Sequence, residues 1–373
     1  MSSKIFYRTF KNMDGPGLCR LWNQSWYAKV RGETVGDDSF DQFVASKLIF
    51  DPNHLVVAVE PPDEPDPCGL SDGRIIGYAH GGFGPNPEMN GCDQSIGYIA
   101  MMIVEQREDQ QEIYQRLLYE MERIFFRLGI RTVFAGAVYP NAPFYVGRVF
   151  GCESNGILEN DPFLPPVLLR NHYIAVERYH ILTFILRNSI PLNFSQRILA
   201  SRVEVVTRDD LFQKDRTYSD SGSAANARAT EMPISREWWE VCAHSNMDDW
   251  KHYVLRDRET GEPIAWVGAS TMARNGKNTL LGLHHIYVKP QFRHQGYAKL
   301  LLTRVLNLLQ RNHSSCQVEL LVSEKNSSAL QIFTGLHFEI ASTGNVYRRD
   351  LPADFPEMLP IDFGQEKGVE VYA

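Results

Sequence analysis

The sequence lacks the features that mark membrane, secreted and zinc-binding proteins. Its 373 residues contain no apolar run of about 18 residues, the length that a membrane-spanning helix needs. The N-terminal stretch MSSKIFYRTF has no apolar core of the signal-peptide kind. Six cysteines are scattered without a C-x-x-C pair, which argues against a disulfide framework or a zinc site. We therefore expect a cytoplasmic protein with free thiols, no metal and no membrane partner.

An excess of positive charge is also missing. Lys and Arg number 38 against 45 Asp and Glu, and the formal net charge is −7. No general attraction to nucleic acid or to an anionic membrane is expected, so any anion site has to be local. With 43% hydrophobic residues the composition is that of a globular protein, and the length suits two domains.

The second half of the chain alternates strand-like and helical patterns. Apolar residues recur at intervals of three and four over 296–311, which predicts an amphipathic helix. Asn326 is a candidate N-cap for a short helix over 327–336. Strands are predicted at 250–257, 264–273, 280–288 and 316–322, with a closing hairpin over 338–351.

The first half repeats this plan. Aligning Val104 with Val288 gives a constant offset of 184 through a strand and the helix that follows it. The repeat concerns the pattern and hardly any residue identity, and it indicates an internal duplication. The predicted elements are strands at 54–60, 73–83, 95–105 and 132–139, with a helix at 112–129.

Four segments are expected from this organisation. Residues 1–190 form the first domain and 191–200 a linker, because a strand-like run ends just before NSIPLNFSQRILA. Residues 201–350 form the second domain. Residues 351–373 are punctuated by proline and are expected to form an extended tail.

The stretch VKPQFRHQGYA joins a predicted strand to the second amphipathic helix. A helix N-terminus presents unpaired N–H groups, and Gly296 lets an anion approach the backbone closely. Arg293 adds positive charge at the same place. Val288, Pro290, Arg293, Gly296 and Ala298 match V-x-P-x-x-R/Q-x-x-G-x-G/A, the coenzyme A loop of the GNAT acyltransferases. The chain thus resembles the GNAT superfamily, strongly over 201–350 and weakly over 1–190; the alternative is a purely structural turn.

The resemblance implies an α/β (α+β) fold with two GNAT-like domains, each a mixed, mostly antiparallel sheet flanked by helices. It also implies acetyl-CoA or another acyl-CoA as co-substrate, and no metal. In this family the strand before the loop exposes backbone that binds pantetheine, and an asparagine lies near the pantetheine arm; Asn326 could instead serve only as an N-cap. The expected cofactor contacts are Ile286, Tyr287, Val288, Arg293, His294, Gln295, Gly296, Tyr297, Ala298 and Asn326.

The equivalent stretch of the first half, VEQREDQQEIY, does not suit a pyrophosphate. Asp109 stands in the place of Arg293, Glu112 in that of Gly296 and Tyr114 in that of Ala298. Carboxylates and a bulky ring at a helix N-terminus repel and obstruct an anion. We expect the first domain to have kept the fold without the cofactor.

Two adjacent histidines lie on the strand before the loop. Strand alternation directs only one of them toward the cleft. Position 284 resembles the strand histidine of arylalkylamine acetyltransferases, and the ordinary pKa of histidine suits a base at neutral pH. His284 is therefore the first candidate for the base and His285 the second, with a non-catalytic histidine as the alternative.

The sequence also departs from the family. Many relatives carry a glutamate two residues before position 284, where this chain has Gly282, and a tyrosine acid where it has Phe333. Trp238 and Trp239 are weak candidates for an acceptor pocket, and packing in the core is the alternative.

The function expected from these residues is transfer of an acyl group from acyl-CoA to a small-molecule or peptide amine. Direct attack in a ternary complex is favoured, because no Cys or Ser has a visible activating partner in the sequence. The alternative is a non-catalytic acyl-CoA-binding protein. The two halves are expected to form an internal pseudo-dimer, in a monomer or homodimer.

Overall fold

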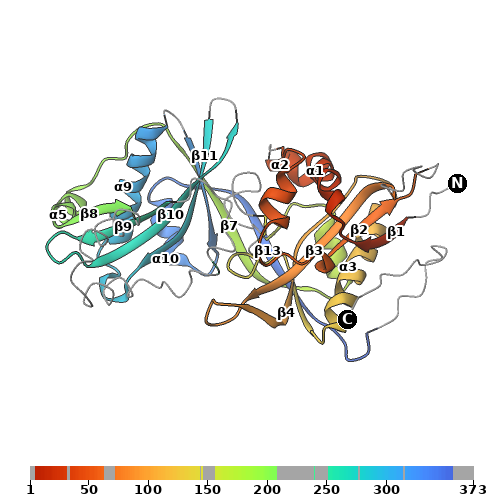
Figure 1. Cartoon of the computed structure of the whole chain (residues 1–373). Coiled ribbons are helices and arrows are strands. Elements are labelled where there is room, and N and C mark those ends of the chain that lie inside the picture. The colour runs from red at the N-terminus through yellow and green to blue at the C-terminus, as the bar shows by residue number, and fades with distance from the viewer. Residues whose placement is uncertain are drawn as a thin grey trace, which may run out of the picture.

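A single sheet runs through two lobes that lie side by side (Figure 1). The computed structural model describes residues 5–31, 34–62, 72–142, 144–145, 156–207, 239, 251–275, 278–313 and 316–355. The first lobe contains β1 (Phe6–Thr9), α1 (Gly15–Gln24), α2 (Trp26–Arg31), β2 (Leu55–Glu60), β3 (Arg74–Pro85), β4 (Cys92–Val104), α3 (Gln110–Arg127), β5 (Thr132–Ala135), β6 (Ile157–Leu158), α4 (Leu164–Arg170) and β13 (Glu339–Asp350). The second lobe contains β7 (Ile174–Leu186), α5 (Phe194–Arg202), β8 (Val203–Thr207), β9 (Lys251–Asp257), β10 (Pro263–Asn275), β11 (Asn278–Val288), α9 (Tyr297–Asn312), β12 (Cys316–Ser323) and α10 (Ser327–Thr334).

The sheet has 13 strands, in the order β1-β2-β3-β4-β5-β13-β7-β12-β11-β10-β9-β8, and β6 pairs with β13 beside this path. Within it β4/β5 and β11/β12 are parallel and the other pairs are antiparallel. The predicted fold class, a mixed and mostly antiparallel sheet flanked by helices in each half, is confirmed. No helix formed by the described residues is long and apolar enough to cross a membrane.

The lobes exchange strands at their junction. β7 comes before the expected linker, yet it pairs with β12 of the second lobe. β13 comes last, yet it pairs with β5 of the first lobe. A bidentate ion pair between Arg349 of β13 and the buried Glu122 of α3, at 2.7 and 2.8 Å, fastens this strand to the first lobe. The first lobe is therefore completed by a strand from the end of the chain, and the second lobe by a strand that lies before the expected linker.

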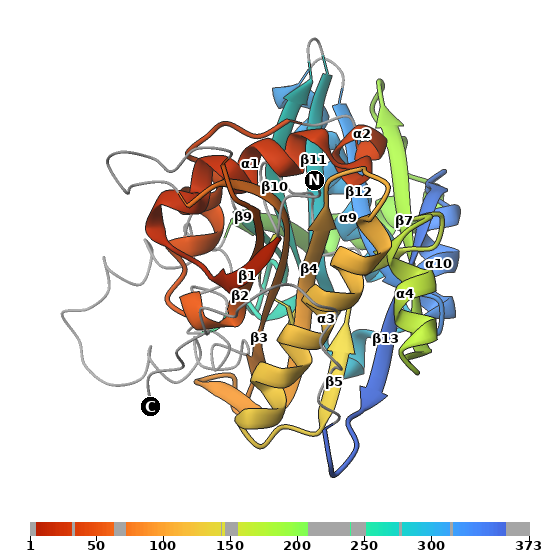
Figure 2. The same cartoon turned by 90° about the vertical axis from the view of Figure 1, so that its right-hand side faces the viewer.

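The first lobe is layered on both faces of its sheet (Figure 2). β2 is buried along its length because its side chains alternate between two cores. One core lies under α3, where Ile113, Leu117 and Met121 form the apolar face that the helical spacing predicts. The other lies under α1 and includes Trp22.

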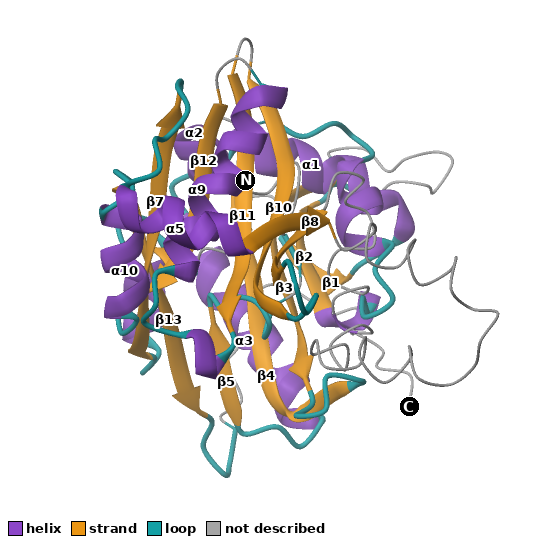
Figure 3. Ribbon diagram, turned by 90° about the vertical axis from the view of Figure 1, so that its left-hand side faces the viewer, coloured by secondary structure: helices purple, strands orange, loops and turns teal. Residues whose placement is uncertain are grey.

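The second lobe presents one face to α5, α9 and α10 (Figure 3). Leu301, Leu302 and Val305 from the predicted stripe of α9 are fully buried on this face. Leu281 and Leu283 of β11 join the same core. Gly282 and His284, which alternate with these leucines along β11, therefore lie on the opposite face of the strand.

Two details differ from the expectations. The predicted hairpin over 338–351 is wrong, because β13 is one continuous strand. Gly344, in the middle of this segment, pairs with Tyr179 of β7 and with Leu158 of β6. Most of the segment 191–200 lies in α5, which packs against α9 with its N-terminus capped by Asn193. The domain boundaries along the sequence remain a proposal.

Candidate functional site

The N-terminus of α9 is open. Gly296 occupies the N-cap position with φ of 86°, a left-handed conformation that glycine adopts without steric cost. No side chain caps the helix, and its first turn contains no acidic residue. Among the described residues, a Cβ placed on Gly296 would meet only the Leu199 side chain, at 3.5 Å. The first N–H groups of α9 are thus accessible to an anion.

The loop before α9 brings a guanidinium to this helix start. Arg293 is exposed, and its Nε donates a hydrogen bond to the Val288 carbonyl at 3.0 Å. The same guanidinium lies 5.5 Å from the ring centroid of Tyr287. His294 has a left-handed φ of 61°, and the side chain of Gln295 donates to the Gln291 carbonyl at 2.9 Å. The loop thus holds the Arg293 guanidinium over the end of β11, three residues before the N-cap Gly296 of α9.

β11 leaves one backbone edge available beside this loop. It pairs with β12 only between Thr279–Gly282 and Cys316–Glu319. Beyond Gly282 the two strands separate, and no other described strand pairs with that edge of residues 286–288. An extended amide-bearing chain can hydrogen-bond there as an added strand. Asn326 lies at the start of α10, where its Oδ1 accepts from the Ala329 N–H at 3.1 Å, so it does serve as an N-cap.

A β-bulge interrupts β11 at the two histidines. His284 pairs with Gly268 and Tyr287 with Trp266, so that His285 and Ile286 together face one residue of β10. His285 has φ of 48°, which is unusual for a residue with a Cβ. The two imidazole centroids are only 6.1 Å apart. The expectation that alternation separates the two side chains is wrong, because the bulge shifts the alternation at this point.

His284 is buried, with 2% of its surface exposed. Its Nε2 lies 2.8 Å from the Ser270 hydroxyl. Burial lowers the pKa of His284 to about 3, although the nearby Glu319 carboxylate acts in the opposite direction. The imidazole is therefore neutral at physiological pH. Ser270 thus has an imidazole partner that is not visible in the sequence.

His285 contacts the first lobe. Its ring lies 4.4 Å from that of Tyr139, in the segment after β5. Trp239 packs with Tyr139, has no exposed surface and donates from Nε1 to the Pro140 carbonyl at 2.9 Å. Trp239 is thus packed as a core residue, and Trp238 lies outside the described residues. Residues 139–140 of the first lobe form part of the wall around the bulge.

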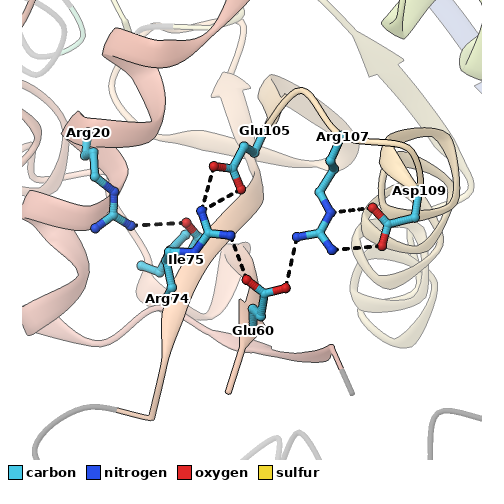
Figure 4. Close-up of polar contacts among 7 residues, drawn as sticks. All are labelled: Arg20, Glu60, Arg74, Ile75, Glu105, Arg107 and Asp109. Atoms are coloured by element: carbon cyan, nitrogen blue, oxygen red, sulfur yellow. Dashed lines mark hydrogen bonds and ion pairs between the residues drawn. The ribbon is translucent and has the colours of Figure 1, made fainter. Parts of the chain in front are cut away.

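The corresponding place in the first lobe holds a network of charged side chains (Figure 4). Arg107 bonds to Asp109 and, at 3.2 Å, to Glu60. Arg74 bridges Glu60 and Glu105, both at 2.6 Å. Three carboxylates thus surround two guanidiniums, and Glu112 adds a further carboxylate in the first turn of α3. The carboxylates at this helix start oppose the approach of an anion.

The separation of strands is nevertheless repeated in the first lobe. β4 pairs with β5 only between Ile96–Ile99 and Thr132–Ala135. A cavity of about 50 Å³ lies where these strands diverge, lined in part by residues 99–104 and by the buried Gln110 and Tyr114 of α3. The duplicated fold therefore keeps the opening in the sheet even where the helix start is changed.

Comparisons with known proteins agree with this geometry. Residues 216–338 match the model of the acetyltransferase (GNAT) family. A GNAT-related glucosamine N-acetyltransferase region of a fungal multi-domain β-N-acetylglucosaminidase superposes with a TM-score of 0.64 at 14% identity, over 93% of this chain and 38% of that one. A tandem GNAT protein from the clavulanic acid biosynthesis pathway gives 0.62 at 13% identity, over 94% and 100% of the two chains.

A GNAT protein from Sphaerobacter thermophilus gives a TM-score of 0.54 at 14% identity, over 93% of this chain and 96% of that one. A sequence comparison with curated proteins gave no match. At these identities the structural likeness shows the fold, and the family match falls on the second half. The chain is a tandem GNAT-fold protein whose second half carries the family signature.

Three residues near the site went unnoticed in the sequence: Ser270, Glu319 and Tyr139. Ser270 and Glu319 belong to strands other than β11, and Tyr139 belongs to the other lobe. No local spacing connects them to His284 or His285. The strand register places Ser270 and Glu319, and the packing of the two lobes places Tyr139.

Proposed function

We propose that the second lobe binds an acyl-CoA, in the simplest case acetyl-CoA, and transfers its acyl group to an amine. The observation that carries this proposal is the open N-terminus of α9 at Gly296, next to the unpaired edge of β11. An anion site that adjoins a free strand edge suits a ligand with two parts: a pyrophosphate for the anion site, and an arm whose amides can hydrogen-bond to the strand edge.

Each part of such a ligand has a partner in this chain. The N–H groups at the start of α9 and the Arg293 guanidinium hold the pyrophosphate. The backbone of Ile286–Val288 pairs with the pantetheine amides, and Asn326 lies on the facing helix start. This order brings the thioester to the bulge at His285, where the two strands separate.

The reaction is direct attack by the amine nitrogen on the thioester carbonyl carbon. Backbone N–H groups at the bulge stabilise the negative charge that develops on the carbonyl oxygen. Phe333 is buried and cannot protonate the leaving thiolate, so this lobe lacks a tyrosine acid at that position. Coenzyme A thiolate is a tolerable leaving group, so the loss of this acid slows the reaction without preventing it.

The acceptor is an amine of a small molecule or of a peptide. The fungal structure described as a glucosamine N-acetyltransferase region makes glucosamine the first acceptor to test. The panel also includes an arylalkylamine, a polyamine and a peptide with a free N-terminus.

The test measures free thiol released from acetyl-CoA with each amine, alongside calorimetric titration with CoA. Wild-type protein should bind CoA and release thiol with at least one class of amine, whereas Gly296→Glu should lose both properties. Unchanged CoA binding by Gly296→Glu would disprove the assignment of the loop. Binding without turnover across the panel would instead establish a non-catalytic acyl-CoA-binding protein.

A further inference from the structure

A serine, a histidine and a glutamate lie across three adjacent strands of the second lobe. Ser270 of β10 and Glu319 of β12 both pair with Gly282 of β11, one on each side. His284 lies two residues further along β11, with its Nε2 at 2.8 Å from the Ser270 hydroxyl. The exposed fractions of Ser270, His284 and Glu319 are 2%, 2% and 5%.

The three side chains share the face of the sheet that is turned away from α9. Directly paired residues of neighbouring strands point to the same face. Leu281 and Leu283 point into the α9 core, so Gly282 and His284 point to the opposite side. Gly282 has no side chain, and therefore leaves the space between Ser270 and Glu319 to the neighbouring imidazole.

The same face leads to the bulge where the thioester is placed by the proposed function. The His284 ring is 6.1 Å from His285, which in turn contacts Tyr139 of the first lobe. The charged and titratable groups that act on His284 are Glu319 from β12 and His285 beside it on β11. Burial disfavours the charged imidazolium and the Glu319 carboxylate opposes this penalty, so a proton taken up by His284 is held only transiently.

We propose that Ser270, His284 and Glu319 form a proton relay for the amine acceptor, an inference that rests on the proposed acyl transfer. Ser270 is the group that meets the amine, while His284 and Glu319 act behind it. In the resting protein the Ser270 hydroxyl donates to Nε2 of a neutral imidazole, whose single proton is on Nδ1.

The proton follows the bond changes of acyl transfer. When the amine nitrogen bonds to the thioester carbon, its proton passes to the Ser270 oxygen as the serine proton passes to Nε2 of His284. The imidazolium is stabilised by the Glu319 carboxylate. When the C–S bond breaks, the proton returns through Ser270 and leaves with the thiol, so that the products are an amide and free coenzyme A.

The first experiment compares Ser270→Ala with Thr271→Ala, which removes a hydroxyl from the adjacent position on the other face. The assay uses acetyl-CoA and the amine of the panel with the fastest thiol release. Ser270→Ala should lower kcat by about 10²-fold with little change in the KM for acetyl-CoA or in Tm, and Thr271→Ala should not.

A proton inventory in mixtures of H₂O and D₂O separates a relay from a structural role. Wild type should give a curved inventory, because two protons move together, and Ser270→Ala a linear one. A wild-type kcat in Ser270→Ala, or an acetyl group found on Ser270 by mass spectrometry, would overturn the relay while the acyltransferase function stands.

The second experiment does not depend on turnover. Nitrogen NMR of histidine-labelled protein, with His284 assigned by His284→Asn, reports which ring nitrogen carries the proton. The relay requires an unprotonated Nε2 between pH 5 and 8, and a proton on Nε2 overturns it. Absence of thiol release with every amine in wild type would overturn the proposed function instead, and the NMR result would still decide the tautomer.

Discussion

The starts of α3 and α9 occupy equivalent places in the two lobes and have opposite properties. α9 begins at a left-handed glycine with no cap and no acid in its first turn. α3 begins after Asp109, contains Glu112 in its first turn and adjoins the ion-pair network of Figure 4. Both helices bury the same kind of apolar stripe. The comparison shows that the fold depends on the stripe, whereas an anion site depends on a few residues at the helix start.

The largest effect is expected when Gly296, at the start of α9, is replaced by glutamate, the residue that α3 has at the equivalent position (Glu112). Gly296→Glu places a carboxylate at the anion site and a side chain at a positive φ, so CoA affinity should fall by about 10²-fold or more. The measurement is the CoA-dependent rise in Tm together with calorimetric titration.

Gly129→Glu is the matched control for this variant. Gly129 has φ of 84° and open space around its Cβ position, yet it lies at the far end of α3. Both variants should lose about 1–2 kcal/mol of stability through backbone strain. If both also lost CoA binding equally, the effect would come from strain and not from the site.

The comparison further predicts one CoA per chain. Of the two equivalent helix starts, that of α9 is the one proposed to bind the pyrophosphate, so titration of wild type should give a stoichiometry near one and Gly296→Glu near zero. A stoichiometry of two in wild type would show that the first lobe binds CoA despite Asp109 and Glu112.

α3 also carries Glu122, which is buried and paired to Arg349 of the exchanged strand β13. Arg349→Ala leaves this carboxylate without its guanidinium and should cost about 2–4 kcal/mol at pH 7. Arg348→Ala, which breaks an exposed pair with Asp350, should cost less than about 1 kcal/mol. Denaturant unfolding provides both values.

The cost of Arg349→Ala should depend on pH. Burial already raises the pKa of Glu122, and Arg349 opposes this shift. Without Arg349 the folded-state pKa rises further, so the variant gains relative stability as the pH falls and Glu122 takes up a proton. A cost that stays constant between pH 7 and 5 would contradict this account.

The smallest effect concerns the histidines that each lobe buries. Burial lowers the pKa of both His284 and His80 to about 3. Because the unfolded chain binds a proton near pH 6.5 and the folded state does not, stability should fall as the pH drops below about 6.5. His284→Asn and His80→Asn should each reduce this slope. In activity profiles His284 should contribute no limb above pH 5, and a limb near 6.5 that disappears in His284→Asn would contradict its burial.

Local sequence patterns were sufficient to predict much of the fold. The apolar stripes of α3 and α9, the strands before them and the turn at Gly296 follow from side-chain periodicity and from glycine chemistry. The predicted hairpin at 338–351 failed because Gly344, in the middle of this segment, pairs with strands on both sides. The residues around a glycine can be the same whether that glycine forms a turn or pairs with neighbouring strands.

What the sequence by itself determined is therefore the local part: two copies of one α/β plan, and one helix start suited to an anion. Only the tertiary structure decided the exchange of β7 and β13, the bulge that turns His284 and His285 to neighbouring positions, and the meeting of Ser270 with His284. Strand partners and register are chosen by burial summed over the whole sheet, and that sum has no counterpart in any short stretch of residues. The burial that keeps His284 neutral likewise arises from residues distant in the chain.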